Sequence, residues 1–111
     1  MNINERIEMY KAKEQFISAV SKAFENCANS NVQKVSYEVY VRQVDNETTY
    51  YTEFIVVTFV GGGKSVRVAS GNSNNANFRE IGKLIDGGYY DELDYYERIK
   101  ANSTELKLEE V

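Results

Sequence analysis

The run "YYTEFIVVTFV", Tyr50–Val60, decides the fold of this 111-residue chain. Its centre is apolar on both faces of an extended chain, a pattern typical of a strand in the middle of a sheet. Residues 32–44, "VQKVSYEVYVRQV", alternate between apolar and polar side chains, and "KSVRVAS" follows at 64–70. Turn residues separate the three runs, "DNET" at 45–48 and "GGG" at 61–63. We therefore predict an antiparallel three-stranded meander with the quoted run as its central strand.

Helical spacing flanks the meander on both sides. Apolar residues recur every three and four positions in a predicted helix that Asn4 caps and that ends near Ala28, with Cys27 on its buried side. After the meander, Asn77 and Glu80 have the spacing of a capping box, which predicts the start of a second helix. The apolar side of that helix consists of Phe78, Ile81, Leu84 and Ile85.

A third helix and a short tail complete the predicted fold. Gly87 and Gly88 end the second helix, and Asp91 caps the third, which turns Leu93, Tyr96 and Ile99 toward the core. Residues 104–111, "TELKLEEV", alternate and predict either a short added strand or a frayed tail. The length suits one domain, 1–111. We predict an α+β fold in the order α-β-β-β-α-α, with the helices packed on one face of the sheet.

The composition argues against most catalytic sites. The chain has no histidine and a single cysteine, so neither a histidine-based triad nor a set of zinc ligands can be built. "GGGKS" at 61–65 resembles part of a phosphate-binding loop, but the residue five before Gly63, where that motif has its first glycine, is not a glycine. We expect a protein that is not an enzyme, with no catalytic residue, no metal and no cofactor.

Neither a membrane span nor a signal peptide is expected. No apolar run approaches the roughly 20 residues that cross a bilayer. The N-terminal residues 1–16, "MNINERIEMYKAKEQF", lack the apolar centre of a signal peptide. We therefore expect a cytoplasmic protein with no membrane partner.

Negative charge is concentrated near the C-terminus. Residues 86–111 contain eight acidic and three basic side chains, a local net charge of −5, whereas residues 1–85 carry a net charge of +1. A field of one sign in one region attracts a basic partner and repels nucleic acid. The excess therefore favours a basic protein surface as the partner.

The segment "GGYYDELDYYERI", residues 87–99, is the candidate site. Its core-facing positions leave seven side chains for a partner: Tyr89, Tyr90, Asp91, Glu92, Asp94, Tyr95 and Glu97. These residues form either a solvated helix face or a recognition surface, because acids also belong in a first helical turn. As a recognition surface, carboxylates edged by aromatic rings can imitate the phosphates and bases of a nucleic acid.

Direct binding of nucleic acid is not expected. A helix, three strands and a helix also occur in double-stranded-RNA-binding domains, but those need a lysine cluster at the second helix. Here residues 73–80, "SNNANFRE", contain Arg79 as their single basic residue. Tyr40 and Tyr51 could stack bases as exposed residues of the sheet, but the charge around them does not form a basic track.

Five stretches resemble the anti-CRISPR proteins, small acidic phage-encoded inhibitors of the type II CRISPR nuclease. They are "MNINERI" at 1–7, "VDNETTY" at 44–50, "NFREIGKLI" at 77–85, "YYDELDYYERI" at 89–99 and "TELKLEEV" at 104–111. A member of that family has the same order of one helix, three strands and two helices. This chain departs from it in a longer first helix and a glycine-rich second turn.

The resemblance implies a mechanism and a set of contacts. The family's acidic surface fills the nuclease site that reads a short DNA motif through arginines. The partner would then be a CRISPR nuclease with its guide RNA in the cytoplasm of a bacterial host. The implied contacts at the last helix are Tyr89, Tyr90, Asp91, Glu92, Asp94 and Glu97, and those at the first turn are Asp45, Asn46 and Glu47. We expect the two patches to converge into one acidic face.

Two other functions use the same segment. A small regulatory or antitoxin-like protein of a mobile element would mask a different basic partner with this face. Alternatively, the tyrosine segment would be the contact between two copies of the chain. We expect a monomer or a weak homodimer.

Overall fold

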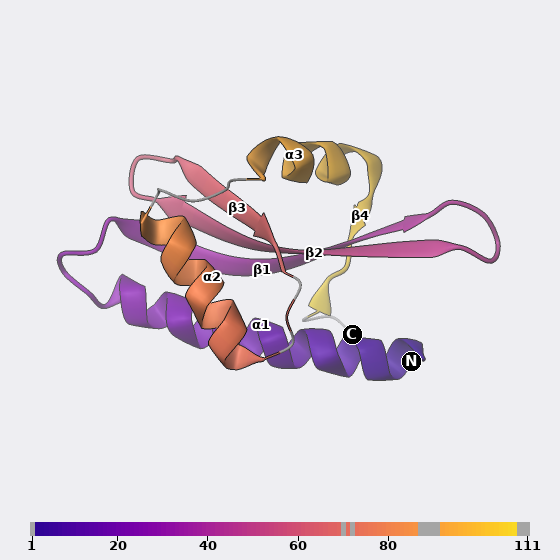
Figure 1. Ribbon diagram of the computed structural model, residues 1–111, viewed down its shortest axis with the longest axis horizontal. Helices are drawn as coiled ribbons and strands as arrows, with labels where there is room; N and C mark the ends of the chain where they lie inside the picture. The colour runs from indigo at the N-terminus through magenta and orange to yellow at the C-terminus, as the bar shows by residue number, and fades with distance from the viewer. Residues whose placement is uncertain (1, 70, 72, 87–91, 109–111) are drawn as a thin grey trace.

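The computed structural model describes residues 2–69, 71, 73–86 and 92–108. A long helix is followed by three strands, two helices and a short strand (Figure 1). The elements are α1 (Ile3–Glu25), β1 (Val32–Gln43), β2 (Thr49–Phe59), β3 (Lys64–Val68), α2 (Asn74–Asp86), α3 (Leu93–Asn102) and β4 (Thr104–Glu105). The predicted α+β class is confirmed, and the tail contributes the short strand that was one of its two predicted forms.

One antiparallel sheet joins all four strands in the order β3-β2-β1-β4. β1 and β2 pair from Val32 opposite Phe59 to Gln43 opposite Thr49, and β3 pairs with the other edge of β2. The meander is therefore as predicted. β4 adds a fourth strand beside β1, where it pairs with Tyr40 and Val41.

Helices cover both faces of the sheet. Ile55 and Val57 of β2 belong to a core cluster with residues of α1 and α2, whereas Phe54 and Val56 belong to a second cluster with α3. In Figure 1, α3 lies above the sheet and α1 and α2 lie below it. The prediction that all helices share one face is wrong. A strand that is apolar on both faces must pack against other elements on both faces. Here α3 packs on the second face.

The first helix begins and ends earlier than predicted. The side-chain oxygen of Asn2 accepts the backbone N–H of Glu5 at 2.9 Å, so Asn2 caps the helix in place of Asn4. The helix ends at Glu25, and Cys27 lies beyond it with an exposed side chain. The predicted burial of Cys27 is therefore wrong, because the apolar spacing extends past the last helical turn.

The second helix also begins earlier than predicted. The Ser73 hydroxyl accepts the backbone N–H of Ala76 at 3.1 Å, and the helix starts at Asn74. Asn77 is consequently a buried residue inside the helix and not its cap. Phe78, predicted on the core side, is 56% exposed, while Ile81 and Leu84 face the core as predicted.

The hairpin of β1 and β2 projects from one end of the molecule. The molecule measures 48 × 26 × 23 Å, and the hairpin turn lies at one end of its longest dimension (Figure 1). β4 pairs with β1 no further along than Val41. Beyond Val41, two residue pairs, Arg42 with Tyr50 and Gln43 with Thr49, continue the hairpin to its turn.

Candidate functional site

Aromatic rings anchor α3 on the sheet. Tyr96 is 1% exposed, and its ring meets Phe54 edge-on at a centroid distance of 5.1 Å and Tyr40 at 6.1 Å. The backbone N–H of Glu92 donates to the carbonyl oxygen of Val66 at 2.8 Å, which fixes the start of the helix to β3. The side that contacts the sheet is the predicted one, consisting of Leu93, Tyr96 and Ile99.

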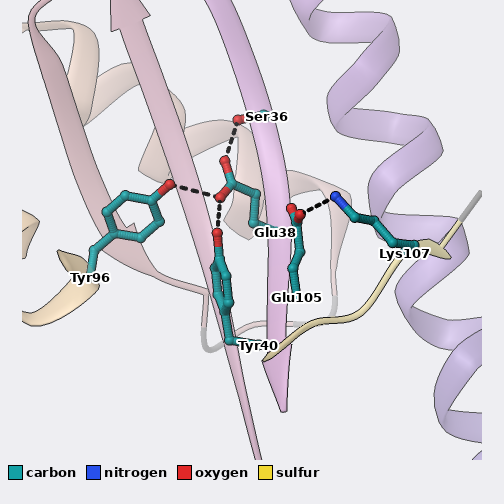
Figure 2. Close-up of polar contacts among 6 residues, drawn as sticks. All are labelled: Ser36, Glu38, Tyr40, Tyr96, Glu105 and Lys107. Carbon is teal, nitrogen blue, oxygen red and sulfur yellow. Dashed lines mark hydrogen bonds and ion pairs between the residues drawn. The ribbon is translucent and has the colours of Figure 1, made fainter. Parts of the chain in front are cut away.

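A carboxylate under α3 accepts three hydroxyl groups (Figure 2). Oε1 of Glu38 accepts the hydroxyls of Tyr40 at 2.5 Å and Tyr96 at 2.7 Å, and Oε2 accepts the Ser36 hydroxyl at 3.1 Å. Burial, and then the hydrogen bond to Glu38, raise the pKa of both tyrosines well above the usual value of 10. Both phenols therefore stay protonated at neutral pH and act as donors. This cluster connects β1 to α3.

The outer face of α3 exposes Asp94, Tyr95 and Glu97. Tyr95 is 38% exposed, and the inner side of its ring contacts Phe54 at a centroid distance of 5.8 Å. The guanidinium carbon of Arg98 lies 5.8 Å from the centroid of the same ring. Tyr95 is therefore a supported aromatic residue at the surface, with Asp94 directly before it in the sequence and Glu97 two residues after it.

The net charge of the α3 region is smaller than the net charge of −5 for residues 86–111 as a whole. From Glu92 to Asn102 there are three acidic and two basic side chains, a net charge of −1. Asp94 lies in the first turn and Lys100 in the last, where each also compensates the helix dipole. The C-terminal excess therefore depends on acids elsewhere, and Glu105 among them forms an ion pair with Lys107.

Three of the predicted contact residues, Tyr89, Tyr90 and Asp91, lie outside the described residues, as do Gly87 and Gly88. The N-cap position of α3 belongs to Glu92, whose side chain makes no capping hydrogen bond. The described part of the predicted segment thus consists of Glu92, Asp94, Tyr95 and Glu97.

The second predicted patch forms the turn between β1 and β2. The Asp45 carboxylate accepts the backbone N–H groups of Glu47 and Thr48, each at 2.8 Å. These bonds, that of Glu47 first, hold the pKa of Asp45 below its usual value. Asp45, Asn46 and Glu47 are all exposed. Part of the Asp45 carboxylate's hydrogen-bonding capacity therefore maintains the turn.

The two patches do not converge. Glu92 is bonded to Val66, which pairs with Val56, and Val56 pairs in turn with Ser36. Asp45 follows Ser36 by nine residues along β1, a distance of about 30 Å at roughly 3.3 Å per residue. Figure 1 shows the hairpin turn at one end of the molecule, away from α3. The prediction of one continuous acidic face is wrong, because the start of α3 lies level with Ser36 and the turn lies beyond the far end of β1.

Sequence reasoning missed the Glu38 cluster. The alternation at 32–44 predicts Ser36, Glu38 and Tyr40 on the polar, outward side of the first strand. The signal that could have found them is on the neighbouring strand, where Phe54 and Val56 make the same face apolar and therefore covered. Tyr40 is 4% exposed and cannot stack bases.

The other candidate for base stacking is also packed within the fold. The ring of Tyr51 lies 6.2 Å from that of Tyr10, and the Arg6 guanidinium lies 4.5 Å from its centroid. The sheet therefore does not present Tyr51 as a free stacking platform.

The described part of the chain forms no candidate metal site. There, no group of three or more cysteine or carboxylate side chains is arranged to hold a metal ion. Gly61–Gly63 forms the turn between β2 and β3, and Gly61 and Gly62 have positive φ. Among the described helices, none is both long enough and apolar enough to cross a membrane.

Comparison of the chain with protein-family models, with curated proteins and with solved structures finds no match.

Proposed function

We propose that this chain is a non-enzymatic cytoplasmic protein that binds a basic protein surface with the outer face of α3. The observation that carries the proposal is the sorting of the two tyrosines in that helix. Tyr96 is buried and bonded to Glu38, while Tyr95 remains at the surface, as do Asp94 and Glu97. A helix fixed in this way offers two carboxylates and a ring in a preorganised arrangement, which lowers the entropic cost of binding.

The proposed partner is a type II CRISPR nuclease with its guide RNA. The argument for this partner is the resemblance to anti-CRISPR proteins together with the chemistry of the face. Arginines that read guanines through two parallel hydrogen bonds form equivalent pairs with carboxylates. Asp94 and Glu97 would occupy such arginines and exclude the DNA motif, and Tyr95 would cover the apolar part of the site.

Charge also favours a protein partner over nucleic acid. The described α3 region is slightly acidic, and a surface that grips phosphates requires a net excess of Lys and Arg. Asp45, Asn46 and Glu47 would then touch a second part of the partner, about 30 Å from the N-terminal end of α3 at roughly 3.3 Å per strand residue. A nuclease much larger than this chain can span that separation.

A nuclease inhibition assay with two charge-reversal variants tests the proposal. We expect the wild-type protein to inhibit DNA cleavage and Asp94→Lys/Glu97→Lys to lose that inhibition. The matched control, Glu8→Lys/Glu25→Lys, reverses two exposed acids of α1 and should inhibit like the wild type. Circular dichroism should be the same for all three proteins.

Each part of the proposal can fail separately. Undiminished inhibition by the α3 variant would refute the assignment of the face. A wild-type protein that leaves cleavage unchanged would refute the nuclease as the partner. If α3-dependent binding to another basic protein were found as well, the regulatory or antitoxin-like function would replace the inhibitor.

A further inference from the structure

A groove runs along the outer edge of β1, remote from the outer face of α3. Its volume is about 370 Å³, and it is bounded by the second half of α1, by β1 from Lys34 to Glu38 and by the chain from Glu105 to Leu108. Ser18 and Lys22 contribute to the helical wall, and Tyr37 and Glu38 to the strand. The groove therefore has a strand edge as one of its sides.

Two hydrogen bonds show which residues of β1 direct their backbone toward this edge. The N–H of Leu106 donates to the carbonyl oxygen of Val39 at 2.8 Å, and the N–H of Val35 donates to the Ser21 hydroxyl at 2.9 Å. Because backbone groups alternate in direction along a strand, Tyr37, midway between them, turns its N–H and C=O to the same side.

The described chain places no strand beside Tyr37. β4 is the last strand at this edge of the sheet, and its ladder with β1 joins Glu105 to Tyr40 and Thr104 to Val41. Leu106 bonds to Val39, and the chain then continues as the wall of the groove. The edge at Tyr37 is consequently open to another extended chain.

We propose that this groove binds an extended peptide segment of a partner protein, which adds to β1 at Tyr37 as a short strand. One peptide residue donates its N–H to the Tyr37 carbonyl oxygen and accepts the Tyr37 N–H, forming a hydrogen-bonded pair. The site differs from the α3 face in both residues and chemistry, so it does not depend on the function proposed above.

The two walls of the groove select the side chains of the peptide. The residue opposite Tyr37 points to the α1 side, where Ser21 approaches close enough to bond β1, so a small side chain fits there. Its two neighbours point to the other face, one opposite Ser36 and the other opposite Glu38. A Lys or Arg at these positions can reach a carboxylate, and Glu38 has about four acceptor sites for its three hydroxyl donors.

A second copy of the chain fits the edge less well than a peptide. Two β1 strands paired about a twofold axis at Tyr37 would place Val35 opposite Val39. The N–H of Val35 and the C=O of Val39 are already bonded to Ser21 and Leu106. Symmetric pairing would break both bonds, whereas a short peptide at Tyr37 breaks neither.

Selection from a random peptide display library tests the site without a known partner. The wild-type protein is the target, and Ser18→Arg, which fills the groove from α1, is the counter-target. Ala19→Arg is the matched control, because it adds the same side chain at the next, exposed position outside the groove lining. We expect enriched peptides that alternate small and basic residues and bind Ser18→Arg at least about tenfold more weakly, a loss of about 1.4 kcal/mol. They should bind Ala19→Arg like the wild type.

The strand pairing is tested with an enriched peptide and amide NMR. The Tyr37 amide should shift on binding and exchange more slowly, and methylation of the peptide N–H opposite Tyr37 should weaken binding about tenfold. No enrichment over Ser18→Arg would overturn the site, and equal binding of the methylated peptide would overturn strand addition. A wild-type dimer that Ser18→Arg dissociates would replace the peptide by a second copy.

Discussion

The Tyr96 hydroxyl donates the direct hydrogen bond from α3 to the Glu38 carboxylate. Removing this hydroxyl therefore tests how much the bond contributes to holding α3 on the sheet. Tyr96→Phe keeps the ring contact with Phe54 at 5.1 Å and deletes a donor 2.7 Å from Glu38. A hydrogen bond to a charged group contributes about 1.5–3 kcal/mol. Because Glu38 is only partly buried and keeps two other hydroxyl donors, we expect the free energy of unfolding to fall by about 1.5 kcal/mol.

A second substitution isolates the bond from the general effect of losing a polar group. Glu38→Gln keeps an acceptor oxygen but removes the charge that makes the hydrogen bonds from Tyr40 and Tyr96 strong. Since charge-assisted bonds are roughly twice as strong as neutral ones, we expect a loss of about 2 kcal/mol. The double variant should lose less than the sum of the two, with a coupling energy of about 1 kcal/mol.

Urea denaturation gives these free energies, and thermal melting should show a drop of about 4 °C per kcal/mol for a chain of this size. The control is Lys107→Ala, which breaks the surface pair with Glu105 in Figure 2 and should change stability by less than about 0.5 kcal/mol. A coupling energy below about 0.3 kcal/mol would refute the reasoning. It would mean that apolar packing alone holds α3.

Three further predictions concern pH, a turn and the cysteine. The tyrosines that donate to a carboxylate, Tyr37, Tyr40 and Tyr96, have a raised pKa and keep their protons in the folded state beyond pH 10, where the unfolded chain releases them, so stability should fall as pH rises above about 10. Absorbance at alkaline pH should show these three tyrosines titrating only as the chain unfolds. Gly62 has φ +99°, so Gly62→Ala should cost about 1 kcal/mol in urea denaturation, with Gly63→Ala as the milder control. Exposed Cys27 should react with a thiol reagent at the rate of a free thiol without denaturant; slow labelling would contradict its exposure.

The meander was predictable from sequence because its signals are local. Alternation at 32–44, the apolar run from Tyr50 to Val60 and the two turns depend on neighbouring residues alone. The spacing of Leu93, Tyr96 and Ile99 likewise gave the buried side of the last helix. Helix ends were less predictable, because several Asn and Ser residues compete as caps and tertiary packing chooses among them.

The side of the sheet that α3 covers was not predictable from the helix itself. The spacing of its apolar residues shows that it packs against something, but not against which face. That choice requires the pattern of β2 to be read across two strands, since Phe54 and Val56 belong to the face on which Glu38 and Tyr40 also lie. The separation of the two acidic patches was hidden for a related reason. It depends on where along β1 the start of α3 lies, which tertiary packing decides.

Acidic residues in this chain have two roles that a count of charges cannot distinguish. Glu53 accepts the Tyr37 hydroxyl and the Lys13 ammonium, both at 2.6 Å, on the α1 side of the sheet, and Glu38 does the equivalent for α3. These carboxylates maintain the fold and are not part of the outer face of α3. Binding by the outer face of α3 would then rest on Asp94 and Glu97, with Tyr95 supplying apolar contact. The affinity of such a surface for its partner should fall far less with rising salt than the affinity of a protein that neutralises many phosphates of a DNA duplex. A salt titration of nuclease inhibition would therefore separate a decoy made of few carboxylates and one ring from a dense electrostatic mimic of DNA.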